Sequence, residues 1–248
     1  YPQSTYVDDA LFQIGTTNTI LNNNEKALVS FKRLVVEYPK SNLVRKSMLK
    51  SGLIYYNNNK YDLALNTMKE VVEKYPGSLE SREALGSIKN IYLDMGRVDD
   101  YFDYTKSLNF TNISASEQDS LTYIAAENSY MENDCKKAVK GFNSYLSGFE
   151  QGAFILNAYF YRAECLFKLG NIDESLSDYL RVLDFPGNNF TETALLKTSA
   201  IEYDKKMYVP ALKHFKLLNQ VAEEKNTVIR SQAGIMRCAY ELEDFQEA

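Results

Sequence analysis

Apolar residues recur at helical spacing in pairs of short segments that are separated by polar turns. Residues 45–57 carry apolar side chains on one helical face, and residues 60–75 do so again after the three asparagines at 57–59. Pro76-Gly77 would end the second helix, because proline cannot continue a helix and glycine readily adopts the backbone needed just past its end. The pattern predicts two helices folded into an antiparallel hairpin.

Serines follow the proline at the ends of these hairpins. Ser78 comes two residues after Pro76 and is expected to cap the next helix through its hydroxyl, because serine oxygens accept hydrogen bonds from the free N–H groups of a helix start. Ser41 holds the corresponding place after Pro39 and is expected to do the same.

The hairpin pattern repeats with a period close to 37 residues. A small residue begins the second helix of each hairpin, and successive marks are 37, 37, 37, 37, 36 and 37 residues apart. A small side chain lets two helices approach closely, so Tyr101, the one large residue at this position, is expected to alter packing in its own repeat. The marks are Ala27, Ala64, Tyr101, Ala138, Ser175, Ala211 and Ala248.

A single hairpin of this length cannot bury its apolar face, whereas stacked hairpins bury it against one another. The sequence therefore predicts an all-α fold, a right-handed superhelical solenoid of antiparallel helix hairpins in a single array over residues 1–248. Tyr1-Pro2 matches the end of a preceding repeat, and Ala248 only starts a second helix, so we expect a fragment of a longer array. About six full repeats and a partial seventh are expected, at residues 5–41, 42–78, 79–115, 116–152, 153–189, 190–226 and 227–248.

Composition limits the chemistry that this chain could carry. The net charge of −5 disfavours nucleic acid as a partner, and no apolar run approaches the roughly 18 residues of a membrane span. Cys135, Cys165 and Cys238 lack paired or metal-binding spacing and are expected in the core. The single histidine, His214, is expected on a helix surface, and no catalytic constellation surrounds it. We therefore expect no enzyme activity, metal or other cofactor; the oligomeric state is left open.

The repeats resemble the tetratricopeptide repeat. Its consensus has a small residue in the first helix, alanine at the start of the second, an aromatic four residues later and a closing proline. The first repeat matches it with Gly15, Ala27, Phe31 and Pro39. The usual period is about 34 residues, and the longer period here, with the closing phrases VVEYPKSN and VVEKYPGS, resembles repeats of bacterial cell-envelope proteins. That resemblance implies a periplasmic or outer-membrane-associated scaffold, with a cytoplasmic location left open.

The resemblance also implies that the first helix of each hairpin lines a concave groove. Positions i, i+4 and i+7 share one face of a helix, and applying this spacing gives a ladder of groove candidates that is rich in aromatic residues. These are Tyr56, Tyr123, Glu127, Tyr130, Phe160, Glu164, Phe167, Tyr203, Arg237 and Tyr240.

Two interpretations of this aromatic ladder are open. Tyrosine rings offer a large contact area and a hydroxyl, which suits a protein interface, and Glu127 and Glu164 would favour a segment bearing lysine or arginine. Alternatively, the rings pack between neighbouring helices. The sequence thus predicts a non-catalytic scaffold that binds a peptide or helix in its groove, a protein partner of unknown identity. The alternatives are a glycan or cell-wall binder that stacks its rings on sugars, and a structural spacer within a longer array.

Overall fold

The computed structural model describes residues 6–108, 110–185 and 187–244, which form only helices and the turns between them. The all-α fold of helix hairpins is confirmed. Tyr1-Pro2 and Ala248, which suggested a longer array, lie outside the described residues. The helices are α1 (Val7–Ile20), α2 (Asn24–Glu37), α3 (Val44–Asn57), α4 (Tyr61–Lys74), α5 (Leu79–Asp94), α6 (Val98–Lys106), α7 (Ala115–Met131), α8 (Cys135–Gly148), α9 (Ile155–Lys168), α10 (Ile172–Leu183), α11 (Thr191–Asp204), α12 (Tyr208–Val221) and α13 (Lys225–Glu241).

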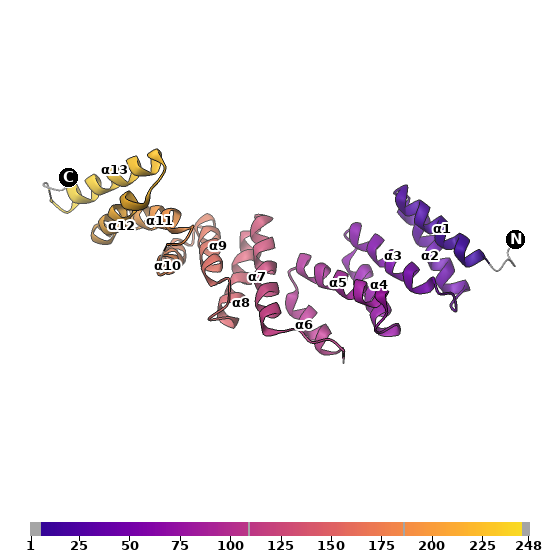
Figure 1. Cartoon of the computed structure of the whole chain (residues 1–248). Helices are drawn as coiled ribbons and strands as arrows, with labels where there is room; N and C mark the ends of the chain where they lie inside the picture. The colour runs from indigo at the N-terminus through magenta and orange to yellow at the C-terminus, as the bar shows by residue number, and fades with distance from the viewer. Residues whose placement is uncertain (1–5, 109, 186, 245–248) are drawn as a thin grey trace. The chain divides into compact units, whose positions relative to one another are not determined.

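The helices form two compact units, Tyr1–Thr111 and Asn112–Ala248. Figure 1 shows that consecutive helices fold back on each other within each unit. The first unit holds the hairpins α1–α2, α3–α4 and α5–α6, and the second holds α7–α8, α9–α10 and α11–α12, followed by α13. The first helices of neighbouring hairpins also contact each other. For example, α7 contacts α9, and α11 contacts α13. This stacking buries the apolar face that a lone hairpin would expose.

The turn inside each hairpin contains one residue with left-handed backbone geometry, at the same place in every repeat. Each stands five residues before one of the repeat marks of the sequence, with φ between 57° and 82°. Asparagine and glycine occupy five of these seven positions because they adopt this conformation at low cost. The residues are Asn22, Asn59, Gly96, Asn133, Gly170, Lys206 and Glu243.

Side-chain caps mark some of the helix starts. Ser78 precedes α5, and its Oγ accepts a hydrogen bond from the Ser81 N–H at 3.0 Å, as predicted. The prediction for Ser41 was wrong, because α3 starts two residues later, after Leu43. The Ser41 Oγ instead accepts the Leu43 N–H at 3.1 Å within the turn. Both serines therefore accept a backbone N–H just after the proline. Only Ser78 stands directly before a helix, because the turn after Pro39 is longer.

The small residues at the repeat marks lie at the centre of the packing. Ala27, Ala64, Ala138, Ser175 and Ala211 are all fully buried. Tyr101 is also buried, at 5% exposure, and its ring packs against Tyr92 and Phe102 with centroids 6.4 and 6.2 Å away. Its helix, α6, has only nine residues. All three cysteines are buried, as predicted.

Glycines in the first helices allow close packing of the second helices. A Cβ added to Gly15 in α1 would lie 2.5 Å from the Phe31 Cε1, and the Phe31 ring is fully buried. Gly86 in α5 is exposed, and a Cβ there would meet nothing within 4 Å. We expect Gly15→Ala to lower the unfolding free energy by about 1–2 kcal/mol, because overpacking outweighs the helix preference of alanine.

The matched substitution Gly86→Ala should instead raise the unfolding free energy by up to about 1 kcal/mol, since only the helix preference changes there. Urea unfolding followed by circular dichroism measures both variants. Equal shifts of the two midpoints would show that the contact between Gly15 and Phe31 does not limit packing.

Candidate functional site

A cleft of about 500 Å³ opens between α9, α11 and α13 in the second unit. These are the first helices of three consecutive repeats, the helices that the sequence placed along a groove. The ring of Phe215 from α12 and small residues of α11 and α13 also line it, so most of its surface is apolar. Its lining residues are Phe167, Leu196, Lys197, Ala200, Ile201, Tyr203, Asp204, Phe215, Ile229, Arg230, Ala233, Gly234 and Arg237.

Three of the predicted groove residues, Phe167, Tyr203 and Arg237, meet in this cleft. Phe167 is 37% exposed, and the Lys197 ammonium lies 4.2 Å from its ring centroid, a cation–π contact between α9 and α11. Tyr203 is half-buried, and Arg237 is exposed. The spacing i, i+4, i+7 brought these residues to one surface because it selects one face of each helix.

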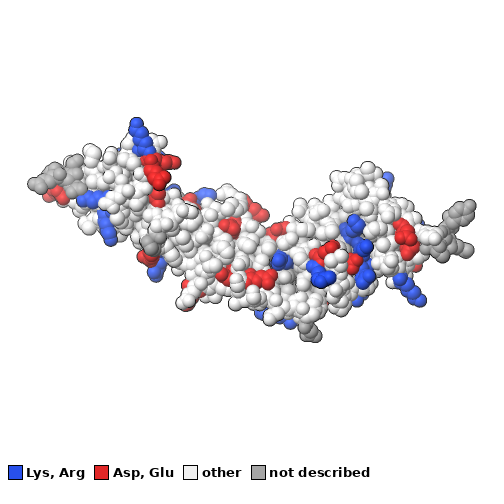
Figure 2. Space-filling model, in the orientation of Figure 1, with Lys and Arg blue, Asp and Glu red and all other residues white. Residues whose placement is uncertain are grey.

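Positive charge is concentrated in the cleft. Lys197, Arg230 and Arg237 line it together with one carboxylate, that of Asp204. Within the described part of the chain, neither arginine has an ion-pair or hydrogen-bond partner. Elsewhere charges of both signs are interspersed, as Figure 2 shows for the visible face of each unit. The sequence analysis missed Lys197 and Arg230, although the seven-residue separation of Arg230 from Arg237 was a signal that they share one face of a helix.

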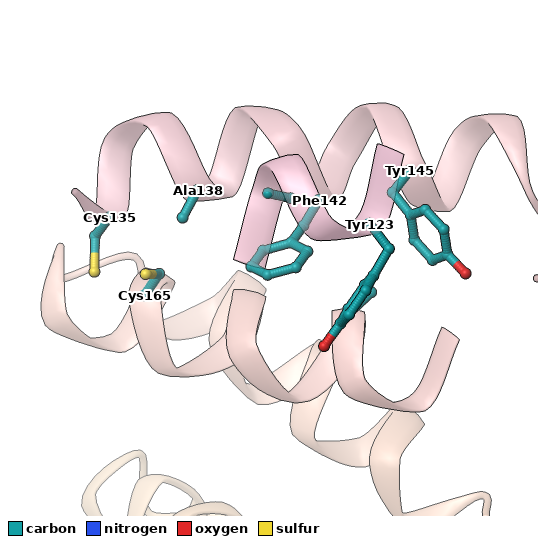
Figure 3. Close-up of a cluster of buried hydrophobic side chains, with 8 residues drawn as sticks. Tyr123, Cys135, Ala138, Phe142, Tyr145 and Cys165 are labelled. Carbon is teal, nitrogen blue, oxygen red and sulfur yellow. The ribbon is translucent and has the colours of Figure 1, made fainter. Parts of the chain in front are cut away.

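Tyr123 and Phe160 were wrongly expected to face a groove. They are 3% and 9% exposed, and each ring stacks on the aromatic residue just before the next first helix. Tyr123 lies 4.4 Å from Phe154 between ring centroids, and Phe160 lies 4.1 Å from Phe190. Figure 3 shows the Tyr123 ring within a buried cluster beside Phe142 and Tyr145. These two rings hold neighbouring repeats together and offer no surface to a partner.

The two predicted carboxylates are engaged within the protein. The Tyr123 hydroxyl donates to Glu127 Oε1 at 2.6 Å, and the Tyr179 hydroxyl donates to Glu164 Oε1. Burial, and then these hydrogen bonds, raise the pKa of both tyrosines well above its ordinary value, so both hydroxyls remain protonated donors. Glu127 and Glu164 are half-buried, and one oxygen of each is held by a tyrosine, while their role in attracting a basic segment stays a prediction.

The remaining predicted residues lie outside the cleft. Tyr56 is half-buried in the first unit and donates to Asp94 Oδ2 at 2.6 Å; burial, with this hydrogen bond, raises the pKa of Tyr56 to about 12. Tyr130 is half-buried, with its ring centroid 4.5 Å from that of Tyr161. Tyr240 is 67% exposed on α13 and does not line the cleft. A binding role for these three residues stays a prediction.

His214 is not the surface residue that the sequence suggested. Its side chain is only 13% exposed, and Nδ1 lies 2.6 Å from Oε2 of Glu202, whose carboxylate is almost fully buried. This pair fixes α12 against α11. Within residues 6–108, 110–185 and 187–244, no cluster of histidine, cysteine and acidic side chains has the arrangement of a metal site. None of the helices described has the length and apolar character that a bilayer crossing requires.

Sequence comparison assigns three of the helix hairpins to a family. The tetratricopeptide repeat model matches residues 9–41, 46–78 and 157–186. The chain contains tetratricopeptide repeats. The matches fall on α1–α2, α3–α4 and α9–α10, so they include a repeat whose first helix lines the cleft. No curated protein matches this chain significantly.

Solved tetratricopeptide repeat structures are similar along most of the chain. One, a tetratricopeptide repeat protein from Parabacteroides merdae, is 16% identical with a TM-score of 0.38 and covers 95% of this chain and 86% of its own. PilF from Pseudomonas aeruginosa is 14% identical with a TM-score of 0.42, covering 92% of this chain and 97% of its own. The TPR2AB domain of yeast Sti1 in complex with pHSP90 is 15% identical with a TM-score of 0.37, and it covers 97% of this chain and 100% of its own.

Proposed function

We propose that this protein is a non-catalytic scaffold that binds a peptide segment of a partner protein in the cleft between α9, α11 and α13. The observation that supports the proposal is an open apolar cleft of about 500 Å³ formed by three successive first helices. Two aromatic rings at its surface, Phe167 and Tyr203, provide the rigid contact area on which interfaces commonly depend.

The form of the cleft favours a peptide over the other functions considered. A spacer would need no partly open rings, whereas Phe167 remains 37% exposed after the repeats have packed. Sugar sites commonly stack tryptophan rings on sugar faces, and this chain has no tryptophan. The envelope location suggested by the repeat endings stays a prediction.

Filling the cleft should weaken binding without disturbing the core. Ala200 is exposed on α11 and lines the cleft, so Ala200→Trp would occupy it. Peptides selected from a random display library on the wild-type protein are expected to lose affinity by about tenfold or more on this variant, because the indole excludes them. Fluorescence anisotropy with the selected peptides measures the change.

The matched control is Gln220→Trp, which adds the same indole at an exposed position of α12 that does not line the cleft. It should bind the selected peptides as the wild type does, and circular dichroism should show unchanged helicity in both variants. Equal affinity for both tryptophan variants would place the binding surface elsewhere, and failure to select any peptide would remove the support for a peptide scaffold.

A further inference from the structure

The charge of the cleft opposes the charge of the chain as a whole. The chain carries a net charge of −5, yet the cleft holds three cations, Lys197, Arg230 and Arg237, against the single carboxylate of Asp204. Arginine guanidinium groups bind carboxylates in two parallel hydrogen bonds, so they favour planar anionic partners over neutral ones. Both arginines are exposed and free of ion pairs within the described residues, so neither must give up an internal partner on binding.

The separation of the arginines limits the spacing of the partner's carboxylates. Positions 230 and 237 are seven residues apart on α13, a separation of roughly 10.5 Å along the helix axis. An extended peptide advances about 3.3 Å per residue, so about three residues of it span the same distance. Two acidic residues separated by a few positions would therefore reach both guanidinium groups.

The cleft has room for a short segment. It offers about 500 Å³, and a segment of a few residues fits within that space, with apolar side chains on Leu196, Ala200 and Phe215 at the lining.

We propose that the occupant of this cleft is an extended acidic segment of a partner protein, in which aspartate or glutamate residues alternate with apolar ones. The carboxylates pair with Arg230 and Arg237, and the apolar side chains pack against the lining from α11 and α12. The inference rests on the proposed function and adds the charge and form of the partner. It differs from the basic segment that Glu127 and Glu164 suggested, because neither of these carboxylates lines this cleft.

The test uses three fluorescein-labelled peptides of about ten residues, long enough in extended form to pass through the cleft. Leucine alternates with glutamate in the first, with lysine in the second and with glutamine in the third. We expect the glutamate peptide to bind the wild-type protein about tenfold or more tighter than the lysine peptide by anisotropy. The affinity should weaken as NaCl rises from about 50 to about 500 mM, because salt screens exposed charges.

Charge reversal separates the cleft from the rest of the surface. Arg230→Glu with Arg237→Glu should weaken the glutamate peptide by about tenfold or more and favour the lysine peptide. The matched control, Lys136→Glu with Lys140→Glu, makes the same change in net charge at two exposed positions of α8 and should leave the affinity unchanged. Equal loss in both double variants would mean that net charge alone governs binding, and the proposed contact with Arg230 and Arg237 would be wrong.

The outcomes also separate this inference from the proposed function. If the glutamine and lysine peptides bind as tightly as the glutamate peptide and Ala200→Trp excludes all three, the cleft binds peptides but does not select acidic ones. If library-selected peptides depend on the cleft but lack aspartate and glutamate, the inference fails while the scaffold function stands. If no peptide of any charge depends on Ala200, both fail.

Discussion

Replacing Arg162 by methionine should lower the unfolding free energy by about 3–5 kcal/mol, because it leaves a buried carboxylate without its partner. Arg162 in α9 holds Asp178 in α10 through two hydrogen bonds of 2.7 Å, from Nε to Oδ2 and from Nη2 to Oδ1. The Asp178 side chain is only 5% exposed, so water cannot replace the lost donors. Urea unfolding followed by circular dichroism at pH 8 measures the loss.

The loss should depend on pH in a defined direction. Burial raises the pKa of Asp178 above its ordinary value, and the hydrogen bonds and charge of Arg162 oppose that rise. Without Arg162 the pKa rises further, so the folded protein takes up a proton at a higher pH than the unfolded chain does. Stability of the variant is therefore recovered as the pH falls from 8 toward 5, relative to the wild type, and lost as the pH rises through the raised pKa.

Two further variants identify the buried charge as the cause. Adding Asp178→Asn to Arg162→Met removes the carboxylate and should restore most of the lost stability and abolish the pH effect. Arg33→Met breaks an exposed ion pair with Glu37 and should leave the midpoint near that of the wild type. If the double variant is as unstable as the single one, the loss comes from side-chain packing and not from the unpaired charge.

Tyr145→Ala should destabilise the second unit by about 3–5 kcal/mol, because it empties a fully buried aromatic site. The ring packs against Tyr123 and Phe149, with centroids 5.6 and 5.4 Å away. It lies at the end of the cluster in Figure 3, next to the junction between two repeats. The midpoint of urea unfolding measures the effect.

Tyr145→Phe tests the hydroxyl separately from the ring. The Tyr145 hydroxyl oxygen accepts the Phe154 N–H at 2.9 Å, just before α9 begins, and so ties α8 to the next repeat. Its removal leaves a backbone donor unpaired and should cost about 1–3 kcal/mol. A phenylalanine variant as stable as the wild type would show that water satisfies this N–H, and the link between the repeats would then depend on ring packing alone.

Local spacing was enough to predict the hairpins and their register. Side chains three and four residues apart share a helical face whatever the rest of the chain does, so the apolar stripe marks each helix. The fully buried Ala27, Ala64 and Ala138 sit where the 37-residue period placed them. The glycines and asparagines of the turns follow the same period, because each hairpin needs one residue with left-handed geometry at one place.

The burial of a ring at a predicted groove position depends on residues about thirty positions away. Tyr123 and Phe167 were selected by the same helical spacing, yet Tyr123 is covered by Phe154 while Phe167 remains 37% exposed. Phe154 and Phe190 recur just before α9 and α11, and this recurrence was a sign in the sequence that an aromatic residue covers the ring of the preceding repeat. The spacing within one helix gives no information about which residue of a neighbouring repeat covers a ring. The hydrogen bond of Glu127 is local, because Tyr123 lies four residues earlier on α7, whereas that of Glu164 comes from Tyr179 on α10 and requires the folded hairpin.

The sequence by itself determined the all-α hairpins, their period and their membership in the tetratricopeptide repeat family, because these depend on short-range periodicity repeated along the chain. Only the tertiary structure decided which rings are buried and where cations gather. The cleft joins Lys197 on α11 with Arg230 and Arg237 on α13 and with Phe167 on α9. Its shape and charge arise when three separate helices are packed side by side, and no spacing within one helix encodes that arrangement.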